Sequence, residues 1–225
     1  MFLLRTYWGG IGLKGAIFDV DGTLIDSMVV WTNSTLEFYK KRGLPFTEEE
    51  FSMFRSMTLT ESLPYIKRVY GLEESVEEIL AEFEKIIFKE YKYSIPIKPY
   101  ADTYLKQLKS DGVKLAVATS TKAHYCEAAL SRLGILDCFD AIAYSDEVGV
   151  SKKEPDVYLL AANRIGILPS DCTVFEDIST GILSAKKAGF KTVSIYDECN
   201  VSETEILKKH SDKYIISWKE LLKKG

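Results

Sequence analysis

Residues 14–23 read Lys-Gly-Ala-Ile-Phe-Asp-Val-Asp-Gly-Thr, and this stretch decides the fold. Residues 14–20 form a short apolar run of the length of a buried strand, and the Asp21-Gly22-Thr23 that follows has the composition of a turn. Strands buried on both faces are typical of parallel sheets covered by helices. The stretch therefore predicts the first strand of an α/β core, with the acidic Asp19 near its end.

The chain changes character twice after this strand. Residues 28–93 contain no convincing strand, and after Ser75 apolar side chains recur at helical spacing behind a capping box, Ser75-Val76-Glu77-Glu78. Farther on, apolar strands alternate with helices of about ten residues, which indicates βαβ units and a parallel sheet. These later strands are expected at residues 114–119, 141–144, 173–175 and 192–195.

The economical arrangement is an α/β core interrupted by a helical insert. We expect the core to comprise residues 14–26 and 97–225, and the insert to comprise residues 27–96. Residues 1–13 form an extension whose apolar run is too short for a signal peptide or a membrane span.

The composition excludes several classes of protein. Of 225 residues, 46% are hydrophobic and 28% are charged, and the net charge is −4, as in an ordinary soluble globular chain without a basic nucleic-acid surface. The four cysteines are widely spaced with no CxxC pair, so reduced thiols are expected rather than a zinc site or a disulfide framework. We therefore expect a cytoplasmic protein that binds neither nucleic acid nor membrane.

Polar residues gather where the predicted strands end. Asp19 and Thr119 end two strands, the pair Glu176-Asp177 follows a third, and Lys152 lies just beyond the short strand 141–144. Ligands of open parallel sheets bind outside the carboxyl ends of the strands, so these side chains are expected to share one site.

Such a set of groups suits phosphoryl transfer. The carboxylate of Asp19 can attack phosphorus and form an acyl phosphate. Asp21, two residues on and on the same side of an extended chain, can protonate the leaving oxygen and then activate the incoming one.

The attack brings a carboxylate to a phosphate dianion, which requires cations. Mg²⁺ held by Asp19 and the pair Glu176-Asp177 would provide one, since Mg²⁺ favours carboxylates, water and phosphate oxygens. Lys152 would neutralise a further phosphoryl oxygen and Thr119 would donate to another.

The four segments resemble the ordered motifs of the haloacid dehalogenase superfamily, and most closely those of the beta-phosphoglucomutase-like phosphatases. The resemblance runs from Lys14 onward and rests on Asp-Val-Asp-Gly-Thr at 19–23, Thr119, Lys152, and Glu-Asp-Ile-Ser-Thr-Gly at 176–181. It implies a Rossmann-like core, a mobile helical cap and Mg²⁺. It also implies that the backbone carbonyl of Asp21 contacts the metal and that the amide of Ser120 binds phosphate.

Three positions depart from the mutase pattern. Lys153 stands where a proline usually follows the motif lysine, Trp31 where the mutases carry a cap histidine, and Leu59 where they carry a phosphate-binding arginine. Arg55 lies near enough in the sequence to substitute, so the substrate contacts expected are Ser120, Trp31 and Arg55.

The leading hypothesis is a Mg²⁺-dependent phosphatase that acts on a small phosphorylated metabolite, as a monomer or a weak homodimer. Two alternatives stay open: a sugar-phosphate mutase, and a non-catalytic binding protein on the same fold. A 2-haloacid dehalogenase is disfavoured because Asp21 and the acidic pair suit metal-assisted phosphate chemistry.

Overall fold

The computed structural model describes residues 13–47, 50 and 59–223, apart from the side chains of residues 31–32 and 59–61. The chain divides into two compact units. A core unit contains Met1–Ser27 and Ile95–Gly225, and a helical unit contains Met28–Ser94.

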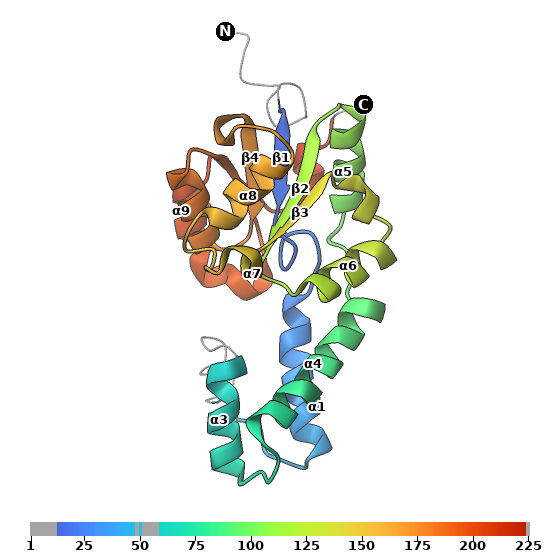
Figure 1. The fold of residues 1–225 in the computed structure, drawn as a ribbon, viewed down its shortest axis with the longest axis vertical. Coiled ribbons are helices and arrows are strands. Elements are labelled where there is room, and N and C mark those ends of the chain that lie inside the picture. The colour runs from blue at the N-terminus through green and yellow to red at the C-terminus, as the bar shows by residue number, and fades with distance from the viewer. Residues whose placement is uncertain (1–12, 48–49, 51–58, 224–225) are drawn as a thin grey trace. The chain divides into compact units, whose positions relative to one another are not determined.

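The core unit is built on a six-stranded sheet in which every pair of neighbouring strands is parallel (Figure 1). Its order is β3-β2-β1-β4-β5-β6. The strands are β1 (Gly15–Phe18), β2 (Lys114–Thr119), β3 (Ala141–Tyr144), β4 (Cys172–Glu176), β5 (Lys191–Ile195) and β6 (Lys213–Ile215). This sheet, with helices in its connections, confirms the predicted α/β, Rossmann-like fold.

Helices connect these strands as the alternating sequence pattern predicted. They are α5 (Ala101–Ser110), α6 (Ala123–Arg132), α7 (Ser145–Val148), α8 (Asp156–Arg164), α9 (Ser179–Lys187) and α10 (Thr204–His210). Short 3-10 segments lie at Leu136–Cys138 (η1), Pro169–Asp171 (η2), Glu198–Glu203 (η3) and Trp218–Leu221 (η4).

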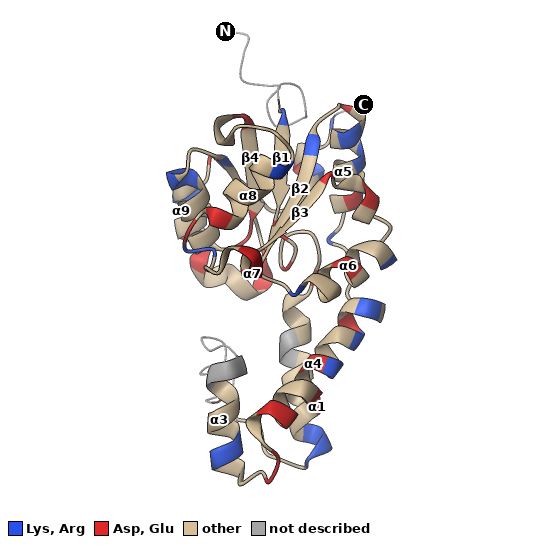
Figure 2. Cartoon of the chain, in the orientation of Figure 1, with Lys and Arg blue, Asp and Glu red and all other residues tan. Residues whose placement is uncertain are grey.

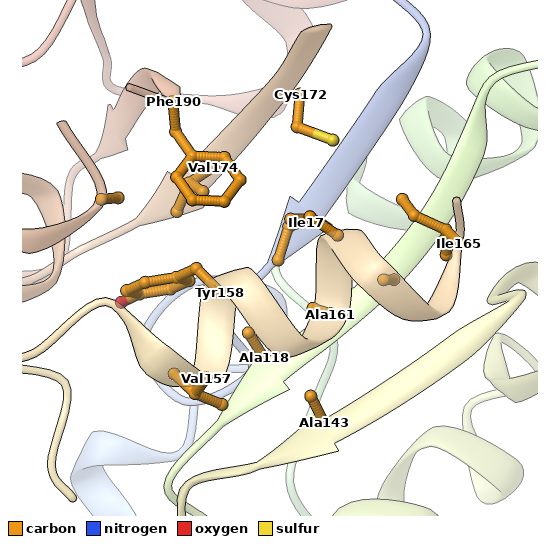
Figure 3. Close-up of a cluster of buried hydrophobic side chains, with 13 residues drawn as sticks. Ile17, Ala118, Ala143, Val157, Tyr158, Ala161, Ile165, Cys172, Val174 and Phe190 are labelled. Atoms are coloured by element: carbon orange, nitrogen blue, oxygen red, sulfur yellow. The ribbon is translucent and has the colours of Figure 1, made fainter. Parts of the chain in front are cut away.

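Each face of the sheet has its own core, because successive side chains of a strand point to opposite faces. Ile17 packs in a cluster with Val157 and Ala161 of α8 and with Val174 of β4 (Figure 3). Its neighbour Phe18 belongs to an aromatic group on the other face. There the ring of Phe18 stacks on that of Phe175 with centroids 4.6 Å apart, and Tyr104 and Trp218 complete the group.

The described helices of the helical unit are α1 (Met28–Lys41), α3 (Leu59–Tyr70) and α4 (Val76–Tyr93). Helix α4 begins with the predicted capping box, in which Ser75 and Glu78 exchange side-chain-to-backbone hydrogen bonds. The apolar stripe of α4 is buried, and Phe83 stacks on Phe38 of α1 with ring centroids 4.4 Å apart. The sequence prediction of a long amphipathic helix after Ser75 is therefore confirmed.

Strand β6 was missed by the sequence prediction. It has three residues, Lys-Tyr-Ile, of which only Ile215 is buried, so it carries no apolar run to detect.

Lysine, arginine and acidic residues are interspersed along the helices, as Figure 2 shows. Within the described part of the chain, no helix has both the length and the apolar character needed to cross a membrane.

Candidate active site

The strand order places the candidate site. From β1 the chain proceeds to β2 and β3 on one side of the sheet, and β4, β5 and β6 continue from β1 on the other side. The order thus reverses between β1 and β4, and in open α/β sheets ligands bind at this switch point, outside the carboxyl ends of the strands. Asp19 follows β1 directly, and Glu176 and Asp177 stand at the end of β4.

Lys152 joins two of these carboxylates. It lies in the loop between α7 and α8, and its ammonium donates to Asp19 Oδ1 and to Glu176 Oε1 in a fully buried cluster. The Ser184 hydroxyl on α9 donates to the Lys152 carbonyl over 2.6 Å and holds the loop in place. The structure therefore brings the residues Asp19, Lys152 and Glu176 together.

Glu176 has a second buried donor, the hydroxyl of Tyr158 on α8. This hydroxyl lies 2.7 Å from Glu176 Oε1, the same oxygen that Lys152 contacts. A side chain at Gly181 could not fit here, since a Cβ would lie 2.5 Å from the Tyr158 hydroxyl and 2.7 Å from Glu176 Oε1. Gly181 in the first turn of α9 thus permits the close approach of the helix to Glu176.

Asp177 is held from two sides. The Thr23 hydroxyl donates to Asp177 Oδ1 over 2.8 Å, and the Asn200 amide donates to Asp177 Oδ2 over 2.6 Å. Gly22 passes so close that a Cβ there would lie 2.2 Å from Asp177 Oδ2, and its φ of +75° suits glycine. The Gly-Thr of the first motif therefore packs directly against the acidic residue that follows β4.

The electrostatics of the cluster are those of an anionic site with too few cations. Burial raises the pKa of Asp19 to about 7. The attraction of Lys152 opposes this rise, and the repulsion of Glu176 and Asp21 adds to it. Burial, followed by the charges of Glu176 and Asp19, also raises the pKa of Asp177 well above its usual range. Burial alone would lower the pKa of Lys152, but attraction by Asp19 and Glu176 raises it above its ordinary value.

The three buried carboxylates fit a divalent cation. Asp19, Glu176 and Asp177 each offer an oxygen, and these oxygens all lie within 4.8 Å of one another. Lys152 is the one ammonium bonded to this cluster among the described residues, so three carboxylates face a single positive charge. Hard oxygen donors of this kind are the ligands that Mg²⁺ takes in proteins.

Asp21 makes a different set of contacts. Its Oδ1 accepts from the Ser27 hydroxyl over 2.5 Å, and its Oδ2 accepts from the Thr121 hydroxyl. Both oxygens of the expected acid/base therefore face hydroxyl donors.

Thr119 and Ser120 lie at the end of β2. Thr119 is fully buried, and its hydroxyl accepts from the Thr121 N–H over 3.1 Å. The Ser120 hydroxyl lies 2.9 Å from that of Ser145. Ser120 also lines a hollow of about 530 Å³, together with Ser145, Asp146, Gly149, Val150 and Ser151.

The structure does not describe two of the side chains that were expected to contact the substrate. Arg55 lies outside the described residues, and Trp31 belongs to α1 with its side chain outside them. Their proposed contacts stay predictions.

Sequence reasoning missed Tyr158 and Asn200. Tyr158 lies on the apolar face of an expected helix, where a tyrosine reads as core and its hydroxyl gives no separate signal. Asn200 lies in a connection after β5 that no motif covers. Thr23, by contrast, is the last residue of the motif at 19–23, and Thr121 directly follows Ser120, which the sequence analysis had named.

The comparisons with known proteins agree with this geometry. A family model described as haloacid dehalogenase-like hydrolase matches residues 16–195. The chain is 30% identical over 185 residues to the phosphorylated carbohydrates phosphatase of Thermotoga maritima, with 80% of this chain and 84% of that one covered. It is 31% identical over 206 residues to the validoxylamine A 7'-phosphate phosphatase of Streptomyces hygroscopicus subsp. limoneus, with 87% and 93% covered.

A solved structure extends the likeness to the whole fold. A putative beta-phosphoglucomutase from Thermotoga maritima matches with a TM-score of 0.82 and 25% identity, over 93% of this chain and 96% of that one. The match of the family model to most of the chain, with related phosphatases at this identity, shows the family. The chain belongs to the haloacid dehalogenase-like hydrolases and is a phosphatase of phosphoric monoesters.

Proposed function

We propose that this phosphatase is Mg²⁺-dependent and hydrolyses a small phosphomonoester, a sugar phosphate or similar metabolite, through an aspartyl-phosphate on Asp19. The observation that carries the proposal is the buried cluster at the switch point. There Asp19 contacts Lys152 and also belongs to a set of three carboxylates close enough to share one metal ion.

The first step is attack by a carboxylate oxygen of Asp19 on phosphorus. The bond from phosphorus to the ester oxygen breaks, and the leaving oxygen takes a proton from Asp21. Lys152 and Thr119 stabilise the oxygens of the transferring group, and the Ser120 amide binds another.

In the second step water attacks the aspartyl-phosphate, and Asp21 takes the proton of that water. The bond from phosphorus to Asp19 breaks, inorganic phosphate leaves, and the carboxylate is regenerated. Mg²⁺, held by Asp19, Glu176, Asp177 and the backbone carbonyl of Asp21, would neutralise phosphate charge and supply Lewis-acid stabilisation.

Asp21 is held by two hydroxyl groups of the core unit. Its Oδ1 accepts from Ser27 and its Oδ2 accepts from Thr121, and these two bonds orient the carboxyl group that we propose as the acid and base. Ser27 is the last residue before the helical unit. We propose that residues 27–96 form a helical cap domain, with residues 14–26 and 97–225 as the core and residues 1–13 as an extension.

The substrate class is inferred from the relatives. Two are named for phosphatases of phosphorylated carbohydrates and of validoxylamine A 7'-phosphate, and another is named hexitol phosphatase B, from Escherichia coli. These names support a polyhydroxylated phosphomonoester as the substrate. We further propose that the enzyme acts in the cytoplasm, as a monomer or a weak homodimer.

Replacement of the nucleophile tests the proposal. Asp19→Asn should abolish phosphate release from a panel of sugar phosphates while leaving the melting temperature close to that of the parent chain, because an amide is a poor nucleophile. More than a few per cent of the parent activity, with contaminating phosphatase excluded, would contradict the covalent mechanism.

The solved structure named as a putative beta-phosphoglucomutase keeps isomerisation as the second candidate. Incubation with β-glucose 1-phosphate and a trace of the 1,6-bisphosphate separates the two. We expect free phosphate to exceed glucose 6-phosphate, and a large excess of glucose 6-phosphate would identify a mutase.

A further inference from the structure

The connection after β5 carries a side chain into the candidate metal site. Asn200 lies within η3, and its amide nitrogen is 2.6 Å from Asp177 Oδ2. The amide N–H of Asn200 is the donor in this contact, and the carboxyl oxygen of Asp177 is the acceptor. This donor comes from neither of the elements that supply the carboxylates.

The backbone around Asn200 is fixed where the segment begins. Asp197 is buried, and its Oδ1 accepts from the Cys199 N–H over 2.9 Å while its Oδ2 accepts from the Lys98 ammonium over 2.8 Å. Lys98 also donates to the Tyr196 carbonyl over 3.0 Å. A partly buried ion pair with further hydrogen bonds on both partners therefore holds the start of the segment in one place.

The end of the segment is fixed as well. Glu203 Oε2 accepts from the Ser179 N–H over 2.6 Å, at the first residue of α9 and two residues after Asp177. The connections after β4 and after β5 are thus joined at two points, one at Ser179 and one at Asp177. Between them, Asn200 has φ −108° and ψ 21°, which interrupts the helical turns.

We propose that Asn200 is a positioning residue for the metal site, and that its amide orients the carboxylate of Asp177 for metal binding. Thr23 holds Oδ1 and Asn200 holds Oδ2, so the carboxylate is fixed about its terminal torsion by one donor on each oxygen. Partners of this kind orient metal ligands, and their loss typically weakens metal affinity about 10- to 100-fold. The inference rests on the proposed function, because it takes Asp177 as a metal ligand.

The test is Mg²⁺ binding to the full chain, measured by titration calorimetry, with Mn²⁺ followed by electron paramagnetic resonance as a second probe. Asn200→Leu keeps the size of the side chain and removes the donor. We expect the dissociation constant for Mg²⁺ to rise about tenfold. Ser202→Ala is the matched control, since Ser202 is exposed in the same 3-10 segment, and it should bind as the parent chain does.

The outcomes distinguish an error in the role of Asn200 from an error in the proposed metal site. Parent-like Mg²⁺ affinity in folded Asn200→Leu overturns the role of Asn200, even if the variant melts at a lower temperature, because a merely structural residue would change stability alone. Should Asn200→Leu fail to fold, Asn200→Ala is measured in the same way, and parent-like affinity there is equally decisive. Asp177→Asn should lose most Mg²⁺ binding, and if it binds as the parent chain does, the proposed metal site itself is wrong.

Discussion

Tyr158→Phe removes a single buried oxygen atom from the core unit. The Tyr158 side chain is fully buried, and its hydroxyl donates to Glu176 Oε1 over 2.7 Å. The ring stays in the cluster between α8 and the sheet, where Phe190 and Ala161 lie nearby (Figure 3). The substitution therefore tests the hydrogen bond without disturbing the apolar packing.

The expected loss follows from the charge of the acceptor. A hydrogen bond to a charged group contributes about 1.5–3 kcal/mol to the free energy of unfolding. Glu176 Oε1 keeps the ammonium of Lys152 as a donor, so the carboxylate is not left without a partner and the lower end of the range applies. We expect a loss of about 1.5 kcal/mol, or about 3–6 °C in melting temperature for a chain of this length.

The measurement is urea unfolding and calorimetry in EDTA, so that bound metal does not add to stability. Tyr144→Phe is the matched control, because the Tyr144 hydroxyl also donates to a glutamate, Glu127, over 3.0 Å but at the surface. Its loss should stay below about 0.5 kcal/mol. If both variants lose the same free energy, the hydroxyl of Tyr158 contributes nothing special to holding Glu176, and this reasoning is refuted.

Three further predictions concern the metal, the glycine beside Glu176 and the helical unit. Chelation with EDTA should stop phosphate release and Mg²⁺ should restore it, whereas Ca²⁺ should not, because its larger and looser shell spoils the geometry; full activity after rigorous metal removal would contradict the metal site. Gly181→Ala should lower the free energy of unfolding by about 1–3 kcal/mol, since the added Cβ would meet the Tyr158 hydroxyl at 2.5 Å, and an unchanged melting temperature would show that the packing is looser than described. Hydrogen bonds from Arg42 and Lys41 hold the pKa of Glu82 at about 2, below its usual range, so the stability that Glu82 contributes is present above the ordinary glutamate pKa and is lost as the pH falls toward 2. Glu82→Gln should therefore be less stable than the parent chain at pH 6 in urea unfolding, with a smaller difference at pH 3, and a difference that grows on acidification would reverse the sign of this argument.

The sheet could be predicted from the sequence because its central strands are short apolar runs that end in polar residues. Residues 114–119 match the central strand β2, and residues 141–144 match β3 at the edge of the sheet. Strand β6 could not be predicted in this way, since two of its three side chains are only partly buried. Its pairing with β5 defines it as a strand, and that pairing leaves no pattern in the sequence.

The part of the site that lies at strand ends and in the sequence motifs could be predicted. Asp19 and Glu176 were expected at one edge of a parallel sheet, and they share the ammonium of Lys152. Two other donors to the carboxylates could not be predicted, because their contacts depend on tertiary packing. The hydroxyl of Tyr158 and the amide of Asn200 come from a helix face and a connection that look, in sequence, like core and loop.

The central place of β1 in the sheet has a consequence during synthesis. Phe18 pairs with Val117 of β2 and with Phe175 of β4, and the whole helical unit is encoded between β1 and these partners. Ribosomes add about 5–20 residues per second, so the roughly 150 residues between β1 and β4 take on the order of 8–30 s to appear. The helical unit can fold in that time, while a strand that is fully buried in the finished protein has both edges open until β2 appears and the edge for β4 open until the end of the interval. Nascent chains of this enzyme should therefore need protection from association until β4 leaves the ribosome.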